Sequence, residues 1–261
     1  MSLDQPLAPP PPDGLGFTSS WPVRAADVDP DNRLRLDGAA RYLQDIAWEN
    51  LQSTFFASTD PFWVVRRTVV DVLRPVVWPD VVELRRWCSG MSTRWTNMRV
   101  SINSSGGGLI ESEGFWINIS EKTGLPTRIS DEGLGYLAQT TDQHRLRWRP
   151  WLAEPPPPES ERDTAFWLRA TDIDQFNHLN NAAYWHAIEE RLLDLPKLVA
   201  VPHRAVLEYI APIFPRESVS IRARLEGGDG RTGTPTLKLW YVVDNDVRAV
   251  ARVAPLTDST D

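Results

Sequence analysis

The chain has 261 residues, a net charge of −7, a single cysteine and twelve tryptophans. At roughly 150 residues per domain, this length predicts one large domain or two small ones, able to fold without disulfides or a metal. The lone Cys88 excludes an intramolecular disulfide and a Cys-x-x-Cys redox or zinc site, which agrees with a cytoplasmic location. The acidic balance argues against a nucleic-acid partner, because phosphate contacts favour a basic surface.

The first segment, residues 1–14, is rich in proline and is expected to be disordered. It lacks the basic start and the apolar run of a signal peptide. No stretch approaches the roughly eighteen uninterrupted apolar residues of a transmembrane helix, so no membrane partner is expected.

One pattern occurs twice in the chain. Residues 23–34 align with residues 168–179 at a constant offset of 145, with Arg, Ala, Asp, Asp, Asn and Leu identical. A helical pattern follows each copy, over residues 37–56 and 180–195. The repeat therefore predicts two units of the same fold.

Strand patterns follow each predicted helix. They combine Val, Ile and Trp with alternating Arg or Thr, which is typical of antiparallel strands with one wet face. In the first half they cover residues 67–75, 81–88, 95–102 and 109–119, and in the second half residues 204–212, 219–225, 236–243 and 247–253. The expected fold class is α+β, with an N-terminal unit at 15–142 and a C-terminal unit at 164–256.

The two units are separated by a linker at residues 143–163. It contains four consecutive prolines, Pro155–Pro158, which cannot join a helix or a sheet interior. A polyproline run of this kind predicts a stiff spacer.

Several familiar enzyme motifs are absent. The chain has no nucleophile elbow and no Walker A sequence. A Gly-x-Gly-x-x-Gly run at Gly228, Gly230 and Gly233 lies between two strand patterns with no helix after it, so a hairpin loop is predicted there. The four histidines show no metal-ligand spacing, and neither a metal nor another cofactor is expected.

A dense polar run precedes the second predicted helix, at residues 172–184. One interpretation is a helix cap, in which Asn180 or Asn181 accepts the first free amides. Capping does not explain a histidine, His178, that the first copy lacks. In the catalytic interpretation, Asp174 attacks an acyl carbon or activates a water for that attack. His178 and Asn177 then hydrogen-bond the substrate or the water, and free amides at the helix start favour the developing negative charge.

This spacing of Asp174, His178, Asn180, Asn181 and Tyr184, which opens a helix followed by long antiparallel strands, resembles the hotdog-fold thioesterases. Two such units in one chain are similar to the acyl-acyl-carrier-protein (acyl-ACP) thioesterases of plants and bacteria. The resemblance extends over about residues 17–256. It implies two tandem hotdog units, in each of which a curved antiparallel sheet wraps a long helix. The two units then form an intramolecular pseudo-dimer, and further dimerisation is left open.

The resemblance also implies roles for individual residues. Asp174 and His178 occupy the family's catalytic positions, and Asn180, Asn181 and Tyr184 are expected to bind substrate. Trp63 resembles the tryptophan that leads a strand in the first unit of the plant enzymes, and is also expected to bind substrate.

The sequence departs from the family at other positions. The family's asparagine falls on Phe176, so the neighbouring Asn177 is the candidate here. The plant Glu-Cys pair falls on Pro212 and Ile213, which implies a mechanism closer to that of the Asp-based acyl-CoA thioesterases. Glu208 is a possible extra carboxylate, although alternating strand positions of this kind are more often structural.

The first copy keeps Asp27, Asp29 and Asn32 but has Arg33 where the second has His178. We therefore expect one active site, in the second unit, while the catalytically degenerate first unit supplies walls of an acyl pocket. The tryptophans are expected to fill the space between each helix and its sheet.

The leading hypothesis is hydrolysis of a fatty acyl chain carried by acyl carrier protein. An acyl-CoA thioesterase and a non-catalytic acyl-binding module are the alternatives. Since carrier proteins are acidic, docking requires a local basic patch. The candidates are Arg66, Arg67, Arg85, Arg86, Arg94, Arg99, Arg145, Arg147 and Arg149. Any of these clusters can equally be the solvated face of a strand.

Overall fold

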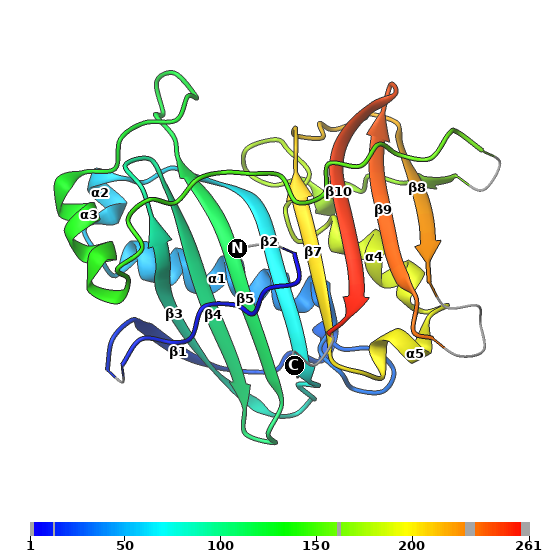
Figure 1. The fold of residues 1–261 in the computed structure, drawn as a ribbon, viewed down its shortest axis with the longest axis horizontal. Helices are drawn as coiled ribbons and strands as arrows, with labels where there is room; N and C mark the ends of the chain where they lie inside the picture. Colours follow the sequence, from blue (N-terminus) through cyan, green and yellow to red (C-terminus); the bar gives the residue numbers. More distant parts are fainter. Residues whose placement is uncertain (1–2, 13, 161–162, 228–232, 257–261) are drawn as a thin grey trace.

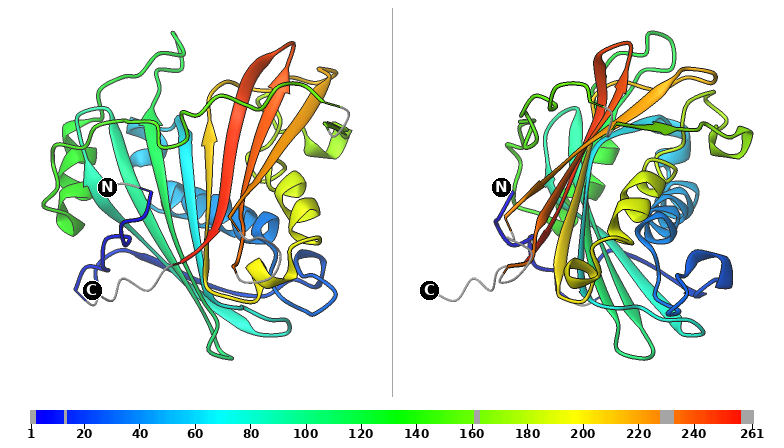
Figure 2. Two further views of the ribbon diagram at one scale, coloured as in Figure 1. Left: turned by 45° about the vertical axis from the view of Figure 1, so that its right-hand side comes forward. Right: turned by 90° about the vertical axis from the view of Figure 1, so that its right-hand side faces the viewer.

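The protein is described by a computed structural model that covers residues 3–12, 14–160, 163–227 and 233–256. Within these ranges the strands form one antiparallel sheet in the order β1-β3-β4-β5-β2-β7-β10-β9-β8-β6. The long helices α1 and α4 lie on one face of this sheet (Figures 1 and 2). None of the described helices has the length and hydropathy that crossing a membrane requires.

The two halves have the same order of elements. The first contains β1 (Phe17–Pro22), the 3-10 helix η1 (Ala25–Asp27), α1 (Leu36–Gln52), α2 (Phe56–Thr59), β2 (Trp63–Arg74), β3 (Val81–Met91), β4 (Trp95–Ser104) and β5 (Leu109–Asn118), followed by α3 (Asp131–Leu137) and η2 (Ala138–Thr140). The second contains β6 (Thr164–Phe166), η3 (Ala170–Asp172), α4 (Trp185–Leu192), α5 (Pro196–Val199), β7 (His203–Tyr209), β8 (Val219–Glu226), β9 (Thr236–Val243) and β10 (Asp246–Pro255). The α+β class and its repetition are therefore confirmed.

The structure differs from the predicted elements at the start of α4 and at the two edge strands, and it leaves the predicted glycine hairpin untested. The helical pattern from residue 180 becomes regular α-helix only at Trp185, because the preceding residues form turns. The short edge strands β1 and β6 carry too few residues to show a clear alternation in the sequence. The glycine motif falls mostly on Gly228 and Gly230, which lie outside the described residues.

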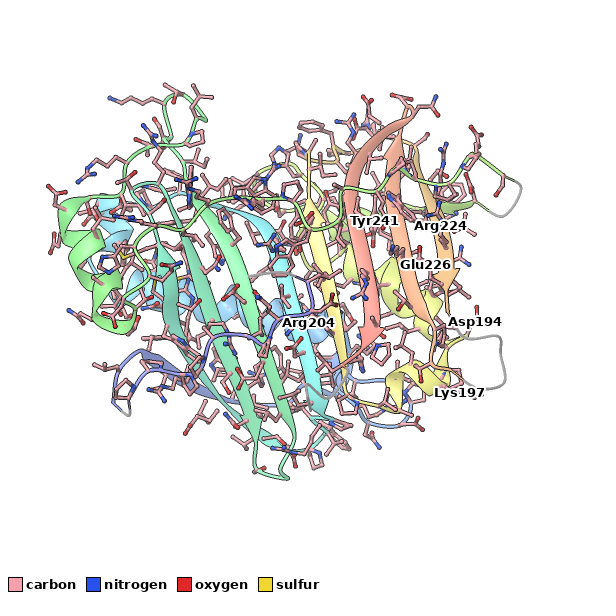
Figure 3. All side chains as sticks on the ribbon, viewed as in Figure 1. Asp194, Lys197, Arg204, Arg224, Glu226 and Tyr241 are labelled. Carbon is pink, nitrogen blue, oxygen red and sulfur yellow. The ribbon has the colours of Figure 1, made fainter. Side chains whose placement is uncertain are left out.

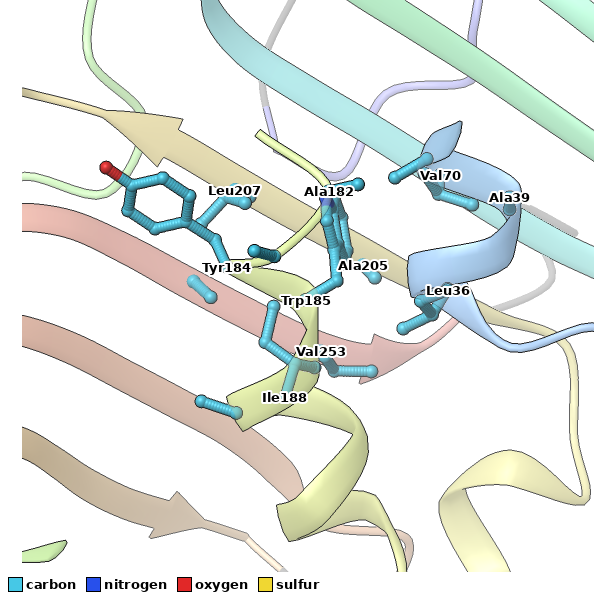
Figure 4. Packing of buried hydrophobic residues seen from close by; sticks show 14 of the residues in the cluster. Leu36, Ala39, Val70, Ala182, Tyr184, Trp185, Ile188, Ala205, Leu207 and Val253 are labelled. Carbon is cyan, nitrogen blue, oxygen red and sulfur yellow. The ribbon is translucent and has the colours of Figure 1, made fainter. Parts of the chain in front are cut away.

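The halves join where β2 pairs with β7. This pairing makes the sheet continuous and brings α1 beside α4 on the same face (Figure 2). The core lies between these helices and the sheet, where side chains from both halves pack together (Figure 4). Its members include Leu36 and Ala39 of α1, Val70 of β2, Trp185 and Ile188 of α4, and Leu207 of β7.

The opposite face of the sheet carries buried charges. Arg204 forms an ion pair with Asp71 at 2.7 Å, and Arg67 forms one with Glu208 at 3.0 Å. Both pairs join facing residues of β2 and β7, so they stabilise the junction between the halves. Arg204, labelled in Figure 3, lies where the two halves of the sheet meet.

The proline-rich segment at the start of the chain covers part of this charged face. Its backbone carbonyls accept hydrogen bonds from Arg204 at Leu3 and Gln5, and from Arg99 at Ala8. This arrangement differs from the disorder expected for residues 1–14. The physical reason is that a buried guanidinium needs acceptors for its N–H groups, and backbone carbonyls supply them.

The linker covers the other part of the same face. The amides of Trp151 and Leu152 donate to the carboxylate of Glu208, and the indole of Trp240 donates to the carbonyl of Glu154. The indole of Trp95 likewise donates to a linker carbonyl. Some tryptophans therefore fill the space between the sheet and the linker, rather than the space between helix and sheet that the sequence predicts.

The contact between α1 and α4 contains a buried acid. Glu189 of α4 accepts a hydrogen bond from the amide of Leu36 at 2.5 Å, at the start of α1. Burial raises the pKa of Glu189 to about 7; the Leu36 hydrogen bond and Arg35 oppose this rise, and Asp37 adds to it. The folded protein therefore favours the protonated form of this side chain.

We expect Glu189→Gln to flatten the dependence of stability on pH. The folded-state pKa lies above the ordinary value of 4.5, so Glu189 contributes stability that is fully present below about pH 4.5 and is lost as pH rises through about 7. The loss is on the order of 3 kcal/mol. Urea unfolding at about pH 5 and about pH 8 measures it. The exposed neighbour provides the control, Glu190→Gln, and an unchanged pH dependence in Glu189→Gln contradicts the assignment.

Candidate active site

A cavity of about 1160 Å³ lies between α1 and the sheet of the first half. Its apolar walls come mainly from the first half, including Leu51, Phe56, Trp63, Met98 and Trp116. The second half contributes the loop before α4 and the end of β7. This volume is somewhat above the range of about 300–1,000 Å³ that is usual for pockets that enclose a small organic ligand.

The structure brings six of the seven predicted site residues to this cavity. Asp174, His178, Asn180, Asn181, Tyr184 and Trp63 all line it. Asn177 does not line it and is exposed to solvent. The polar end of the cavity is therefore the loop of residues 174–184, and Trp63 approaches from β2.

The loop is shaped by the side chain of Asp174. One carboxylate oxygen, Oδ1, accepts the amides of Phe176 at 2.9 Å and His178 at 3.3 Å. Asn177 has a φ of 59°, a left-handed conformation that asparagine tolerates better than most residues. Asp174 therefore fixes the turn with one oxygen, and its second oxygen, Oδ2, makes no hydrogen bond within the described residues.

The first half contains the same turn with a different partner. Asp29 Oδ1 accepts the amides of Asp31 and Arg33, and Asn32 has a φ of 63°. The second oxygen of Asp29, however, pairs with the Arg33 guanidinium at 2.9 Å. Where Arg33 neutralises this carboxylate, the second half has His178. The turn therefore accounts for the aspartate and the asparagine in both halves. The difference that supports a catalytic interpretation of the second half is His178 in place of Arg33.

His178 is half-buried at the cavity wall. Its ring packs edge-on against Phe214, with the ring centroids 5.0 Å apart. Among the described residues, neither ring nitrogen has a hydrogen-bond partner, so both remain available to a ligand.

Asn180, Asn181 and Tyr184 line the cavity and also make contacts that hold the chain before α4. Asn180 Oδ1 accepts the amide of Ala182 at 2.8 Å, which closes a turn before α4. The N-cap of α4 is Tyr184 and no side chain caps the helix, so the predicted helix cap at Asn180 or Asn181 is wrong. The Asn181 carbonyl accepts the Tyr209 hydroxyl at 3.2 Å, and the Asn181 amide has no acceptor in the ranges described. Tyr184 is buried, and burial raises the pKa of its hydroxyl well above the ordinary value.

Three of the predicted docking arginines are instead buried within the fold. Arg67 and Arg99 form ion pairs with Glu208 and Glu111 on the covered face of the sheet. Glu208 is therefore a structural partner and not an extra catalytic carboxylate. Arg86 faces the cavity, whereas its neighbour Arg85 donates to backbone carbonyls on the opposite face.

The sequence contained one signal for the inward position of Arg86. Alternate residues of a strand share a face, and Val82 and Leu84 of β3 are fully buried in the core beside α1. Arg86 continues that alternation. Asn50 had a comparable signal, because it follows the fully buried Ile46 by four residues on the same face of α1. Tyr136 had none, because it lies in α3, where the sequence predicts no helix.

The described residues include no group of three or more His, Cys, Asp or Glu side chains arranged to hold a metal ion. The polar end of the cavity thus consists of a carboxylate, an imidazole, amides and hydroxyl groups.

Comparison with known families covers both halves. Residues 14–136 match the family described as “Acyl-ACP thioesterase N-terminal domain”. Residues 156–241 match the family described as “Acyl-ACP thioesterase C-terminal domain”. Two helix-and-sheet units around one cavity, with a carboxylate and an imidazole at its polar end, define a hotdog-type thioester hydrolase. The two matches together span most of the chain, which therefore belongs to the acyl-ACP thioesterase family.

Relatives from bacteria and plants agree with this assignment. The chain is 43% identical over 249 residues to the uncharacterized protein Rv2001 of Mycobacterium tuberculosis, covering 95% of this chain and 96% of that protein. It is 24% identical over 218 residues to oleoyl-acyl carrier protein thioesterase 1 of Arabidopsis thaliana. That alignment covers 72% of this chain and 59% of the plant protein.

Solved structures share the fold over nearly the whole chain. The 12:0-ACP thioesterase of Umbellularia californica superposes with a TM-score of 0.71 at 19% identity, covering 91% of this chain and 92% of that one. An acyl-ACP thioesterase of Bacteroides thetaiotaomicron gives a TM-score of 0.69 at 15% identity, with coverages of 91% and 96%. These similarities confirm the hotdog-type fold.

The geometry of the turn predicts that Asn177→Gly retains both stability and turnover. Glycine adopts the left-handed conformation freely, and residue 177 lines no part of the cavity. Asn177→Ala should lower the free energy of unfolding by about 1 kcal/mol, and Asn32→Ala in the first half by a similar amount. Urea unfolding and a thiol-release assay measure the two effects. Loss of turnover in a stable Asn177→Gly protein would return this residue to a catalytic role.

Proposed function

We propose that the protein hydrolyses fatty acyl-ACP to the free fatty acid, with Asp174 and His178 as the catalytic residues. The observation that carries this proposal is the single cavity that connects the loop of residues 174–184 with apolar walls in the first half. In this arrangement the acyl chain lies along those walls and its thioester carbonyl lies at the loop. The two halves then act as an intramolecular pair, in which the second supplies the chemistry and the first supplies the pocket.

The unpaired oxygen of Asp174 has two possible roles. As a base, it takes a proton from a water whose oxygen adds to the thioester carbon, and the carbon–sulfur bond then breaks to release a thiol and the acid. As a nucleophile, it forms an acyl-enzyme anhydride that water hydrolyses. In either route His178 hydrogen-bonds the water or the carbonyl, and the Asn181 amide is placed to stabilise the oxyanion.

We expect Asp174→Asn to lower kcat/KM by about 100-fold or more, because it removes the charge that attacks or accepts a proton. The amide oxygen of the new side chain can still accept the amides of Phe176 and His178, so the turn is preserved. The matched control is Asp29→Asn, which makes the same change in the first half and should leave turnover near that of the wild type. Thiol release from an acyl thioester measures both variants. The assignment is wrong if Asp29→Asn abolishes turnover and Asp174→Asn does not.

The surface near the cavity supports carrier protein as the partner. Arg66 lines the cavity, and its guanidinium lies 5.6 Å from the ring centre of Trp148. Arg147 and Arg149 flank that tryptophan, and both are exposed, as is Arg145. This run of positive charge beside the cavity matches an acidic carrier protein.

The charge-reversed double variant Arg145→Glu, Arg147→Glu tests the carrier. We expect KM for acyl-ACP to rise about 10-fold with kcat unchanged, because like charges weaken docking without altering the chemistry. The same acyl chain on coenzyme A is the control and should show a smaller effect. Equal effects on both carriers, or none, would favour the alternative of an acyl-CoA thioesterase.

A further inference from the structure

The cavity has a second polar region, formed by side chains of β3, α1 and α3. In the sheet, β4 and β5 separate β3 from β2, which carries Trp63. Arg86 of β3 donates from Nη1 to Asn50 Oδ1 at 2.6 Å, and Asn50 Nδ2 donates to the hydroxyl of Tyr136 at 3.4 Å. All three side chains line the main cavity. They also line a smaller adjoining cavity of about 160 Å³. A hydrogen-bonded cluster therefore lies beyond the apolar walls, where a hydrocarbon chain offers no polar atom.

Arg86 is the unusual member of this cluster. In the described part of the chain it has no carboxylate partner, whereas the buried Arg67 and Arg99 each have one. Burial lowers the pKa of Arg86 to about 10, and the neighbouring groups are the thiol of Cys88 and the hydroxyl of Tyr136. The Arg86 side chain is half-buried and faces the cavity. A guanidinium in largely apolar surroundings is costly unless its charge and its several N–H groups find acceptors. One bond to Asn50 leaves most of that capacity unused.

Most of the other side chains that line the cavity are apolar, although Asp45 and Glu121 also line it. Phe56, Trp63, Met98 and Trp116 line the same cavity as Asp174 and Arg86. A ligand that matches all three regions has a thioester at one end, a hydrocarbon middle and a hydrogen-bond acceptor at the other end. An unsubstituted fatty chain leaves the guanidinium without an acceptor.

We propose that the preferred substrate is an acyl thioester whose distal end carries an oxygen acceptor that binds Arg86. A carboxylate matches the guanidinium best, because it compensates the buried charge as well as accepting its N–H groups. A hydroxyl group supplies an acceptor alone and binds more weakly. This inference rests on the proposed function, since it defines the acyl chain that the same site accepts.

Binding tests the inference without requiring catalysis. The probes are non-hydrolysable amide analogues of acyl-pantetheine over a series of chain lengths, each with a methyl, hydroxyl or carboxylate end. For the wild-type protein, calorimetry should give a Kd about 10- to 100-fold lower for the carboxylate end than for the methyl end at the best chain length. A wild-type protein that prefers the methyl end at every length overturns the inference.

The variant Arg86→Met assigns the preference to this residue. We expect it to bind methyl-ended chains at least as well as the wild type and to lose the preference for carboxylate. Arg85→Met is the matched control, because this neighbouring arginine donates to the backbone carbonyls of Leu15 and Pro11 on the opposite face of β3, and it should keep the wild-type preference. A carboxylate preference that persists in a folded Arg86→Met protein contradicts the assignment, and the wild-type series decides the question if that variant does not fold.

A parallel thiol-release assay with the corresponding thioesters separates this inference from the proposed function. Selective binding of carboxylate-ended chains with no hydrolysis of any thioester contradicts the proposed function and supports the role of Arg86. Hydrolysis that is fastest with methyl-ended chains supports the proposed function and contradicts the role of Arg86 in choosing the substrate.

Discussion

The pairing of β2 with β7 is the interaction on which the rest of the structure depends. It makes one sheet from two repeated units, brings α1 beside α4, and places a loop of the second half at a cavity walled by the first. Facing charges cross this junction, with Asp71 opposite Arg204 and Arg67 opposite Glu208. A buried ion pair of this kind specifies register, since any slip leaves charges without partners.

The two copies of the aspartate turn show how one local structure serves two purposes. In both, an aspartate oxygen accepts two backbone amides and an asparagine adopts a left-handed conformation. In the first copy Arg33 pairs with the remaining oxygen of Asp29. In the second copy that oxygen lies at a cavity with His178 beside it. A shared turn and a changed partner therefore distinguish the two copies, and this difference is the basis for proposing the catalytic site in the second half.

The cover on the outer face explains two compositional features. The proline-rich segment and the linker both cross this face and bond to buried arginine, glutamate and tryptophan side chains. Extended proline-rich backbone leaves its carbonyls free for such contacts because it makes no hydrogen bonds of its own. The extended segments that cover the charged face of the sheet thus account for part of the high proline and tryptophan contents.

The sequence by itself determined the features that local pattern controls. The strand alternation, the repeat and the polar run before the second helix were sufficient to predict the α+β class and the loop of Asp174 and His178 at the cavity. The resemblance to the family added Asn180, Asn181, Tyr184 and Trp63 as cavity residues. Only the tertiary structure decided that Asn177 faces solvent, that Glu208 is a buried structural partner, and that Arg86 faces the cavity while Arg85 does not. Those outcomes depend on which segment covers each face of the sheet. The covering residues lie far away along the chain, so local periodicity records only the inward alternation of Val82, Leu84 and Arg86 and not what covers either face.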